Sequence, residues 1–429
     1  MKLDDLDIRW VHKAFSPAQE ITDPKLFVGR QKEIRDSINA LLNPGSFMAI
    51  FGLRGVGKSS IARQIKLIAE GDKTLPAALG LKKSLPRKKD FDFIVHYYTS
   101  DGFVHNVYDL FKRMLFGDEE NPSLFSLTKS GDKQLAEFKR TVGIEGGASF
   151  LGAKVGAKGA EESKFVPYVS DDLIQQFRAL LGTIRKDNQD RDGLLILIDE
   201  FDTIQNKDGF ASIVKACSSD YVKFGVVGIA STGTELIKDH SSIGRQIDFI
   251  SIPLMPELEL LQILKKAEHN VGQAITYEDT AMSEICDKSE GFPYFTHLLG
   301  KEAMLIAYER GSTNVSLRDI DSLSKAISEG RLTNIFENVY HEAVKNSPQR
   351  EVLLKLFAEE DTSDIPSADV YSSAIDMGIT NPSQLMKQLT SPDNIATIPV
   401  LTKVHDKHYR FTDPVFKVYA RIRNWKFSE

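Results

Sequence analysis

The sequence has few of the features that define several protein classes. Only two of its 429 residues are cysteines, Cys217 and Cys286, and their spacing fits neither a disulfide framework nor a thiolate metal site. No hydrophobic run approaches the roughly 18 residues of a membrane-spanning helix. The N-terminal stretch MKLDDLDIRW also has no apolar signal-peptide core. These absences predict a cytoplasmic protein without membrane contact.

Excess positive charge and several common catalytic patterns are also absent. The net charge is −6, so binding to nucleic acid would depend on a local basic patch. The nine histidines show no HExxH spacing, and no GxSxG segment offers a serine nucleophile. A metal site made by the protein alone and a serine-hydrolase site are therefore not expected. The length predicts two or three domains.

The stretch MAIFGLRGVGKSSIARQI, residues 48–65, contains the spacing Gly52-x4-Gly57-Lys58-Ser59. An apolar run precedes the glycines and an amphipathic run follows them, which predicts a strand, a loop and a helix in that order. In a phosphate-binding loop, backbone N–H groups cradle the phosphates, Lys58 reaches the β- and γ-phosphates, and Ser59 binds Mg²⁺. The alternative is a glycine turn before a helix.

A second apolar run, residues 194–198, ends at Asp199 and Glu200. Asp199 would hold the Mg²⁺ shell, and Glu200 would polarise the attacking water. A third run, FGVVGIAST, ends at Ser231 and Thr232, whose hydroxyls would contact the γ-phosphate or the water, or would cap the next helix. The sequence thus predicts ATP and Mg²⁺ as cofactors and ATP hydrolysis as the reaction.

Two further stretches, AFSPAQEITDPKLFVGRQKEI and SEGFPYFTHLLGKEA, flank these motifs. Together the four stretches resemble AAA+ ATPases of the origin-recognition and STAND-like branch, over residues 14–303. The resemblance implies an α/β fold: a P-loop core with a parallel sheet, then a helical lid and a C-terminal winged helix. It divides the chain into an N-terminal segment (1–26), the core (27–253), the lid (254–332) and the winged-helix domain (333–429).

The resemblance also implies roles for individual residues. Beside the base it places Val28, Gly29 and Arg30. Around the phosphates and Mg²⁺ it places Gly52, Arg54, Gly55, Val56, Gly57, Lys58, Ser59 and Ser60. The metal ligands would be Ser59 and Asp199. The catalytic residues would be Lys58, Asp199, Glu200, Thr232 as first sensor with Ser231 as fallback, and Arg245.

Arg245 is interpreted as an arginine finger that reaches a neighbouring subunit of a homo-oligomer, or else as a surface arginine. Pro293 would contact the nucleotide from the lid. The lid lacks the second-sensor arginine of initiator ATPases, so the coupling between the lid and the nucleotide phosphates would depend on Pro293 or His297, or be weak. A Gly/Ala-rich insertion at about 140–165 is interpreted as a flexible loop, or as an ordered element at a contact.

The C-terminal region reads as three short helices and a β-hairpin, which predicts the winged helix independently. Its third helix would present polar groups to base edges, namely Asn381, Gln384, Lys387 and Gln388. Its wing and tail carry seven cations, namely Lys403, Lys407, Arg410, Lys417, Arg421, Arg423 and Lys426. Acidic residues earlier in the domain roughly cancel this charge, and the same scaffold docks proteins in STAND-like ATPases.

Three functions follow from these features. The favoured prediction is a nucleotide-gated molecular switch that assembles with a separate effector protein, with phage defence as one setting. The alternative is an initiator-like, transposition or repair ATPase that engages duplex DNA through the winged helix. The third is an accessory loader with little hydrolysis of its own.

Overall fold

The computed structural model describes residues 2–17, 19–118, 121–129, 131, 170–237, 244, 246–328, 334–390 and 399–423. The Gly/Ala-rich insertion, Arg245 and Lys426 lie outside these residues. The chain forms two compact units: unit 1 comprises residues 1–30, 53–57 and 253–429, and unit 2 comprises residues 31–52 and 58–252. The four-part division of the chain stays a prediction.

Unit 2 is built on a five-stranded parallel sheet with the order β2-β3-β4-β1-β5. The strands are β1 (Phe47–Gly52), β2 (Phe93–Thr99), β3 (Gly193–Asp199), β4 (Val222–Ile229) and β5 (Ile247–Ile252). The three central strands are short apolar runs with almost every residue buried, as expected for parallel strands covered on both faces. In this order β4 separates the glycine-loop strand β1 from the Asp199 strand β3.

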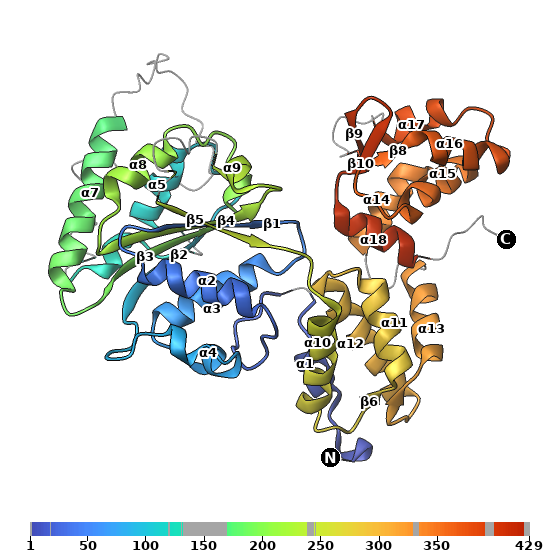
Figure 1. Cartoon of the computed structure of the whole chain (residues 1–429), viewed down its shortest axis with the longest axis horizontal. Helices are drawn as coiled ribbons and strands as arrows, with labels where there is room; N and C mark the ends of the chain where they lie inside the picture. Colours follow the sequence, from blue (N-terminus) through green and yellow to red (C-terminus); the bar gives the residue numbers. More distant parts are fainter. Residues whose placement is uncertain are drawn as a thin grey trace, which may run out of the picture. The chain divides into compact units, whose positions relative to one another are not determined.

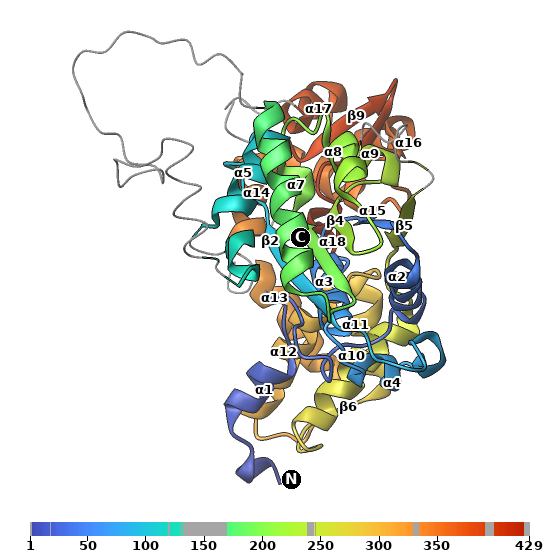
Figure 2. The ribbon, with the colours of Figure 1, turned by 90° about the vertical axis from the view of Figure 1, so that its left-hand side faces the viewer.

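Helices cover both faces of the sheet (Figure 1). On one face lie α2 (Gln31–Leu42), α3 (Lys58–Ala69) and α4 (Thr74–Ala78). On the other lie α5 (Val107–Phe116), α7 (Ser170–Asp187), α8 (Phe210–Cys217) and α9 (Gly233–Leu236). Short 3-10 helices occupy the loops: η2 (Lys82–Ser84), η3 (Leu124–Leu127) and η4 (Phe201–Thr203). Figure 2 shows α7, in green, running alongside the sheet.

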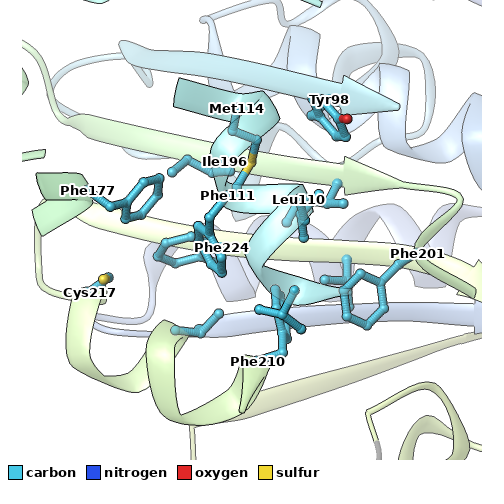
Figure 3. Close-up of a cluster of buried hydrophobic side chains, with 14 of the residues drawn as sticks. Tyr98, Leu110, Phe111, Met114, Phe177, Ile196, Phe201, Phe210, Cys217 and Phe224 are labelled. Atoms are coloured by element: carbon cyan, nitrogen blue, oxygen red, sulfur yellow. The ribbon is translucent and has the colours of Figure 1, made fainter. Parts of the chain in front are cut away.

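An apolar core fills the space between the sheet and α5, α7 and α8 (Figure 3). Phe111 and Phe177 meet edge to face with centroids 4.7 Å apart, and Phe201 and Phe210 meet at 4.5 Å. Both separations lie near the short end of the range that aromatic pairs favour. Phe201 follows Glu200 directly, so this core fixes the chain at the carboxyl end of β3.

Unit 1 contains the predicted helical lid. Its helices are α10 (Glu257–Asn270), α11 (Asp279–Ser289), α12 (Pro293–Glu309) and α13 (Leu317–Ser328), with a parallel pair of short strands, β6 (Thr276–Tyr277) and β7 (Asn314–Val315). The N-terminal η1 (Leu3–Asp5) and α1 (Ile8–Ala14) precede the sheet in sequence, and α1 packs against α10 and α12. α11 ends just before Gly291, where the sequence predicts a helix stop.

The C-terminal part of unit 1 is a winged helix. Its helices are α14 (Asn334–Val344), α15 (Pro348–Glu359), α16 (Ser367–Asp376), α17 (Pro382–Thr390) and α18 (Pro414–Ile422). The strands β8 (Ile365–Pro366), β9 (Leu401–His405) and β10 (His408–Phe411) form an antiparallel sheet of order β8-β10-β9. The predicted fold class is therefore confirmed in all three parts. No helix in the described ranges is long and apolar enough to cross a membrane.

A buried ionic network holds the winged helix together. The Arg423 guanidinium donates to the Glu337 carboxylate at 2.8 and 3.0 Å and lies 3.5 Å from the ring centre of Tyr340. The hydroxyls of Tyr340 and Tyr419 donate to Glu351 and Glu337, respectively. Buried charges persist only where they are paired in this way. Arg423 is thus committed to the interior, and it is not one of the surface cations that the sequence suggested.

Candidate active site

The glycine loop follows β1 directly. Gly55 and Gly57 have φ values of +78° and +93°, a region that glycine adopts without steric cost. A Cβ on Gly52 would lie 2.5 Å from the carbonyl oxygen of Ile252, so only glycine fits where β1 pairs with β5. The predicted strand, loop and helix are all present, and the glycines occupy the positions where the backbone requires them.

Lys58 and Ser59 form the first turn of α3, a helix of 12 residues. Backbone N–H groups in the first turn of a helix have no partner within the helix, which favours a bound anion. Lys58 is buried, whereas Ser59 and Ser60 are half-buried. A cation and two hydroxyls at a helix N-terminus match the chemistry of a phosphate group.

Arg30 supports the glycine loop from within unit 1. Its guanidinium donates to the carbonyl oxygens of Pro253 and Val56, both at 2.9 Å, and only 2% of the residue is exposed. Its backbone N–H donates to the Glu259 carboxylate. This supporting role was not predicted, because the sequence does not show which carbonyl a buried guanidinium meets. The predicted contact of Val28, Gly29 and Arg30 with the base stays a prediction, as does the phosphate contact of the exposed Arg54.

The carboxylate of Asp199 ends β3 and is buried. Its Oδ2 accepts a hydrogen bond of 2.6 Å from the Tyr97 hydroxyl, and its Oδ1 accepts one of 2.8 Å from the Glu200 N–H. Tyr97 comes from the neighbouring strand β2, where it pairs in register with Leu197. Sequence reasoning did not single out Tyr97, because it appears there as one aromatic residue of a buried strand.

Glu200 is exposed and has left-handed backbone angles, φ 53° and ψ 35°. Such a conformation costs a non-glycine residue on the order of 1–3 kcal/mol and is frequent at functional sites. Surrounding contacts hold it: the Glu200 carbonyl accepts hydrogen bonds from the N–H and hydroxyl of Thr203. The sharp turn after Asp199 leaves the Glu200 carboxylate at the surface beside the buried Asp199.

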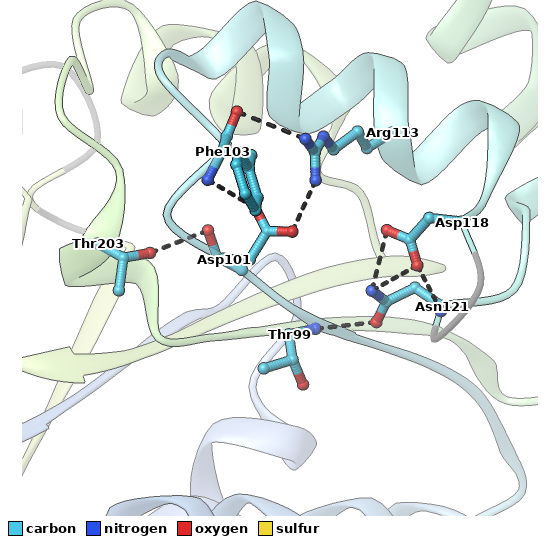
Figure 4. A network of polar contacts seen from close by, with 8 residues as sticks. Thr99, Asp101, Phe103, Arg113, Asp118, Asn121 and Thr203 are labelled. Carbon is cyan, nitrogen blue, oxygen red and sulfur yellow. Dashed lines mark hydrogen bonds and ion pairs between the residues drawn. The ribbon is translucent and has the colours of Figure 1, made fainter. Parts of the chain in front are cut away.

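The loops that follow β2 and β3 are tied to each other (Figure 4). The Thr203 hydroxyl lies 3.1 Å from the Ser100 hydroxyl, and Ser100 N–H donates to the Asp199 carbonyl. Asp101, in the loop after β2, pairs with Arg113 of α5 at 2.8 Å. These contacts make the carboxyl edge of β2 and β3 a rigid base for the two acidic residues.

The hydroxyl residues after β4 lie between the glycine-loop strand and the Asp199 strand. Thr232 caps α9, because its hydroxyl accepts from the Glu235 N–H at 3.2 Å. Ser231 is exposed, and its N–H donates to the Glu235 carboxylate. The capping role that the sequence left open is therefore present for Thr232. Which hydroxyl acts as the first sensor stays a prediction.

The sheet brings the predicted groups of unit 2 to one edge. The carboxyl ends of parallel strands share an edge, and neighbouring strands lie about 4.8 Å apart, so β1 and β3 are about 10 Å apart. Lys58 and Ser59 follow β1, Ser231 and Thr232 follow β4, and Asp199 ends β3. Extended lysine and carboxylate side chains can span this width when a phosphate and a hydrated cation lie between them.

The oxygen donors at this edge fit Mg²⁺. Ser59 and Asp199 supply a hydroxyl and a carboxylate, the hard ligands that Mg²⁺ prefers. Within the described ranges, no group of three or more histidine, cysteine, aspartate or glutamate side chains could hold a metal by itself. Mg²⁺ is usually bound by one or two carboxylates together with substrate phosphates. The residues therefore fit a metal that arrives with a nucleotide.

The lid residues are placed as follows. Pro293 is the first residue of α12 and follows Gly291, whose φ is +79°. His297 is buried, its Nδ1 accepts from the Ser16 N–H at 3.4 Å, and burial lowers the pKa of the ring to about 4. This contact commits His297 to the N-terminal segment, so Pro293 stays the better candidate for coupling the lid to nucleotide. The finger role of Arg245 also stays a prediction, since that residue is outside the described ranges.

Several cations of the winged helix bind within the protein. Lys417 donates to the carbonyl oxygens of Glu360 and Thr362. Arg421 donates to the Glu290 carboxylate at 2.8 Å and to backbone carbonyls at the end of α15. The predicted DNA-contacting residues that are exposed are Asn381, just before α17, Gln384 and Lys387 on α17, and Lys403, Lys407 and Arg410 on the wing. Of these, Lys403 pairs with Asp406 and Arg410 with Asp364, both at exposed positions.

Comparison with known proteins gives structural matches only. No family model matches the chain, and no curated protein matches its sequence. The Aeropyrum pernix ORC1 protein in complex with DNA is 14% identical, with a TM-score of 0.45, over 96% of this chain and 95% of that chain. The Drosophila origin-recognition complex bound to DNA is 11% identical, with a TM-score of 0.43, over 99% and 94%.

The chain is similar in structure to origin-recognition proteins. A third example is the Aeropyrum pernix ORC2 protein with ADPNP and ADP, which is 16% identical, with a TM-score of 0.42, over 91% of this chain and 92% of that chain. These similarities agree with the fold that the predicted resemblance implied. At these scores they describe the fold alone, and function depends on the residues of this chain.

Proposed function

We propose that this protein is a Mg²⁺-dependent P-loop ATPase that engages duplex DNA through its winged helix. The observation that carries the ATPase part is the sheet edge of unit 2. There, Lys58 and Ser59 begin the helix after β1, while Asp199 ends β3 two strands away and Glu200 follows it. A phosphate loop and an acidic pair in this order supply a phosphate-binding group, a metal-shell carboxylate and a base.

Each residue has one chemical task in this proposal. Lys58 and the N–H groups of the α3 N-terminus bind the β- and γ-phosphates. Ser59 and Asp199 hold Mg²⁺, which supplies charge stabilisation when it is bound. The Glu200 carboxylate orients and polarises the attacking water, and Ser231 or Thr232 donates a hydrogen bond to the γ-phosphate or to that water. Arg245 contributes its charge from a neighbouring copy of the chain.

The DNA part of the proposal is supported by the winged helix. Asn381, directly before α17, and Gln384 and Lys387 on α17 are exposed, and amide and amine groups of this kind read base edges in the major groove. Lys407 stands at the tip of the β9–β10 hairpin with a left-handed φ of 58°. Origin-recognition proteins of similar structure have been solved with DNA, as described above. A separate effector partner has no such support.

Removing two of these charges should weaken DNA binding. The test is the double variant Lys387→Gln with Lys407→Asn. Asparagine is chosen at position 407 because it adopts the left-handed backbone conformation of that residue readily. We expect the affinity for a 30-base-pair duplex to fall about 10-fold at moderate salt. The slope of log affinity against log salt concentration should become shallower by about one for each lost phosphate contact. Fluorescence anisotropy over a range of salt concentrations measures both.

The matched control removes two exposed lysines from unit 2, Lys186→Gln with Lys215→Gln. Its net charge equals that of the test variant, so it should bind DNA as the wild type does. Equal losses in both double variants would mean that only net charge matters and would contradict a winged-helix DNA site.

A further inference from the structure

We infer that Tyr97 is a positioning residue for the Mg²⁺ site, because its hydroxyl fixes the orientation of the Asp199 carboxylate. This inference rests on the proposed ATPase function and adds a residue to its metal site. The carrying observation is the 2.6 Å hydrogen bond from the Tyr97 hydroxyl to Asp199 Oδ2, within a buried environment. A charge-assisted O–H···O⁻ bond of this length is strong.

The carboxylate is held at both oxygens. Oδ2 accepts from Tyr97, and Oδ1 accepts from the Glu200 N–H at 2.8 Å. Each carboxylate oxygen has two lone pairs, so one protein hydrogen bond leaves a second lone pair for a metal ion or its water. With both oxygens fixed, the carboxylate plane cannot rotate, and the remaining lone pairs keep one direction.

Tyr97 is itself held in place by a residue of α3, the helix that follows the glycine loop. The Arg63 guanidinium on α3 lies 3.7 Å from the centre of the Tyr97 ring. A cation over the ring face is attracted to its π electrons and withdraws charge from the phenol, which makes the hydroxyl a better donor. The chain Arg63–Tyr97–Asp199 thus links the helix that binds phosphate to the carboxylate that binds metal.

The strand geometry makes this contact specific to Tyr97. Successive side chains of a strand point to opposite faces, so Tyr97 and Tyr98 leave β2 in opposite directions. Tyr98 packs in the apolar core with α5, on the face of the sheet opposite to Tyr97 (Figure 3). Two adjacent buried tyrosines therefore differ in one respect that matters here, and Tyr98→Phe is a matched control for Tyr97→Phe.

Removing the Tyr97 hydroxyl should weaken the binding of Mg²⁺ and leave the binding of nucleotide without metal unchanged. Residues that orient a metal ligand typically account for a 10–100-fold change in metal affinity. For Tyr97→Phe we expect the Mg²⁺ concentration at half-saturation to rise about 10-fold. Titration of Mg²⁺ into a complex with a fluorescent ADP analogue measures this value without turnover. Tyr98→Phe should keep the wild-type value.

The experiment separates the inference from the function on which it rests. Asp199→Asn should abolish the Mg²⁺ response, and a wild-type protein with no Mg²⁺ response would overturn the proposed function together with this inference. A normal wild-type response with equal half-saturation in Tyr97→Phe and Tyr98→Phe would overturn the inference alone. So would a Tyr97→Phe variant whose nucleotide affinity in EDTA falls as much as its Mg²⁺ affinity, since that result indicates a general structural role.

Discussion

Glu200→Gln should bind ATP and fail to hydrolyse it. The substitution keeps the size of the side chain and removes the carboxylate that polarises water, so we expect turnover to fall about 100-fold or more, the usual range for a lost general base. Lys58, Ser59 and Asp199 are unchanged, so the affinity for ATP should stay within about 3-fold of the wild type, a difference of less than 1 kcal/mol. Steady-state phosphate release and equilibrium nucleotide binding, measured on the same preparation, check the two halves.

The left-handed backbone conformation of Glu200 should persist in this variant. Thr203 and Asp199 hold that backbone through the main-chain N–H and carbonyl of Glu200, which the substitution keeps. Asp208→Asn is a suitable control, because it removes an exposed carboxylate a few residues away. Full turnover in Glu200→Gln would mean that another residue polarises the attacking water.

Stability should fall on acidification because of His96. This residue lies on β2 with 2% of its surface exposed, and neither ring nitrogen has a hydrogen-bond partner within the described ranges. Burial lowers its pKa from 6.5 to about 4. Between these values the unfolded chain binds the proton and the folded chain does not. Stability is therefore fully present above pH 6.5 and is lost as the pH falls towards 4.

The expected size follows from linkage. A shift of this kind is worth about 1.4 kcal/mol for each pH unit, so at pH 5 the loss is about 2 kcal/mol and at pH 4 about 3 kcal/mol. His96→Leu removes the titrating ring without leaving a polar group unpaired, so the free energy of unfolding should depend less on pH. Urea unfolding followed by circular dichroism at pH 7.5 and pH 5.0 measures the difference.

His269→Leu, which removes an exposed ring from α10, is the control and should keep the wild-type pH dependence. The buried His297 is present in all three proteins, so its own contribution cancels in the comparison. If wild type and His96→Leu lose equal stability between the two pH values, His96 is not the group responsible.

Much of the fold follows from local patterns in the sequence. Leu194–Ile198 is a continuous apolar run because β3 is covered on both faces, and the glycines after β1 mark torsions that other residues avoid. The winged helix was also predictable, because its turns separate short helices from a hairpin of two β-like runs. Each of these patterns depends on neighbours within a few residues.

The supporting contacts were not predictable, because they join residues far apart in the chain. Tyr97 on β2 bonds to Asp199 on the neighbouring strand β3, and the Arg30 side chain donates to the carbonyl of Val56. The sequence also could not show that Arg421 and Arg423 turn inward, since a basic tail reads as surface until its partners Glu290 and Glu337 are located. The sequence shows the charge of such a residue, and only the fold shows its partner.

The central claim is that the loop before α3 binds the phosphates of a nucleotide. Its most direct test is equilibrium binding of a fluorescent ATP analogue to the wild type, to Lys58→Ala and to Lys66→Ala, in Mg²⁺. Lys66 lies on the same helix and pairs with Glu70 at the surface, so its variant should bind like the wild type. Loss of the charged hydrogen bonds of Lys58, worth about 1.5–3 kcal/mol, should weaken binding about 10–100-fold. Equal affinity of all three proteins would contradict the phosphate-loop assignment.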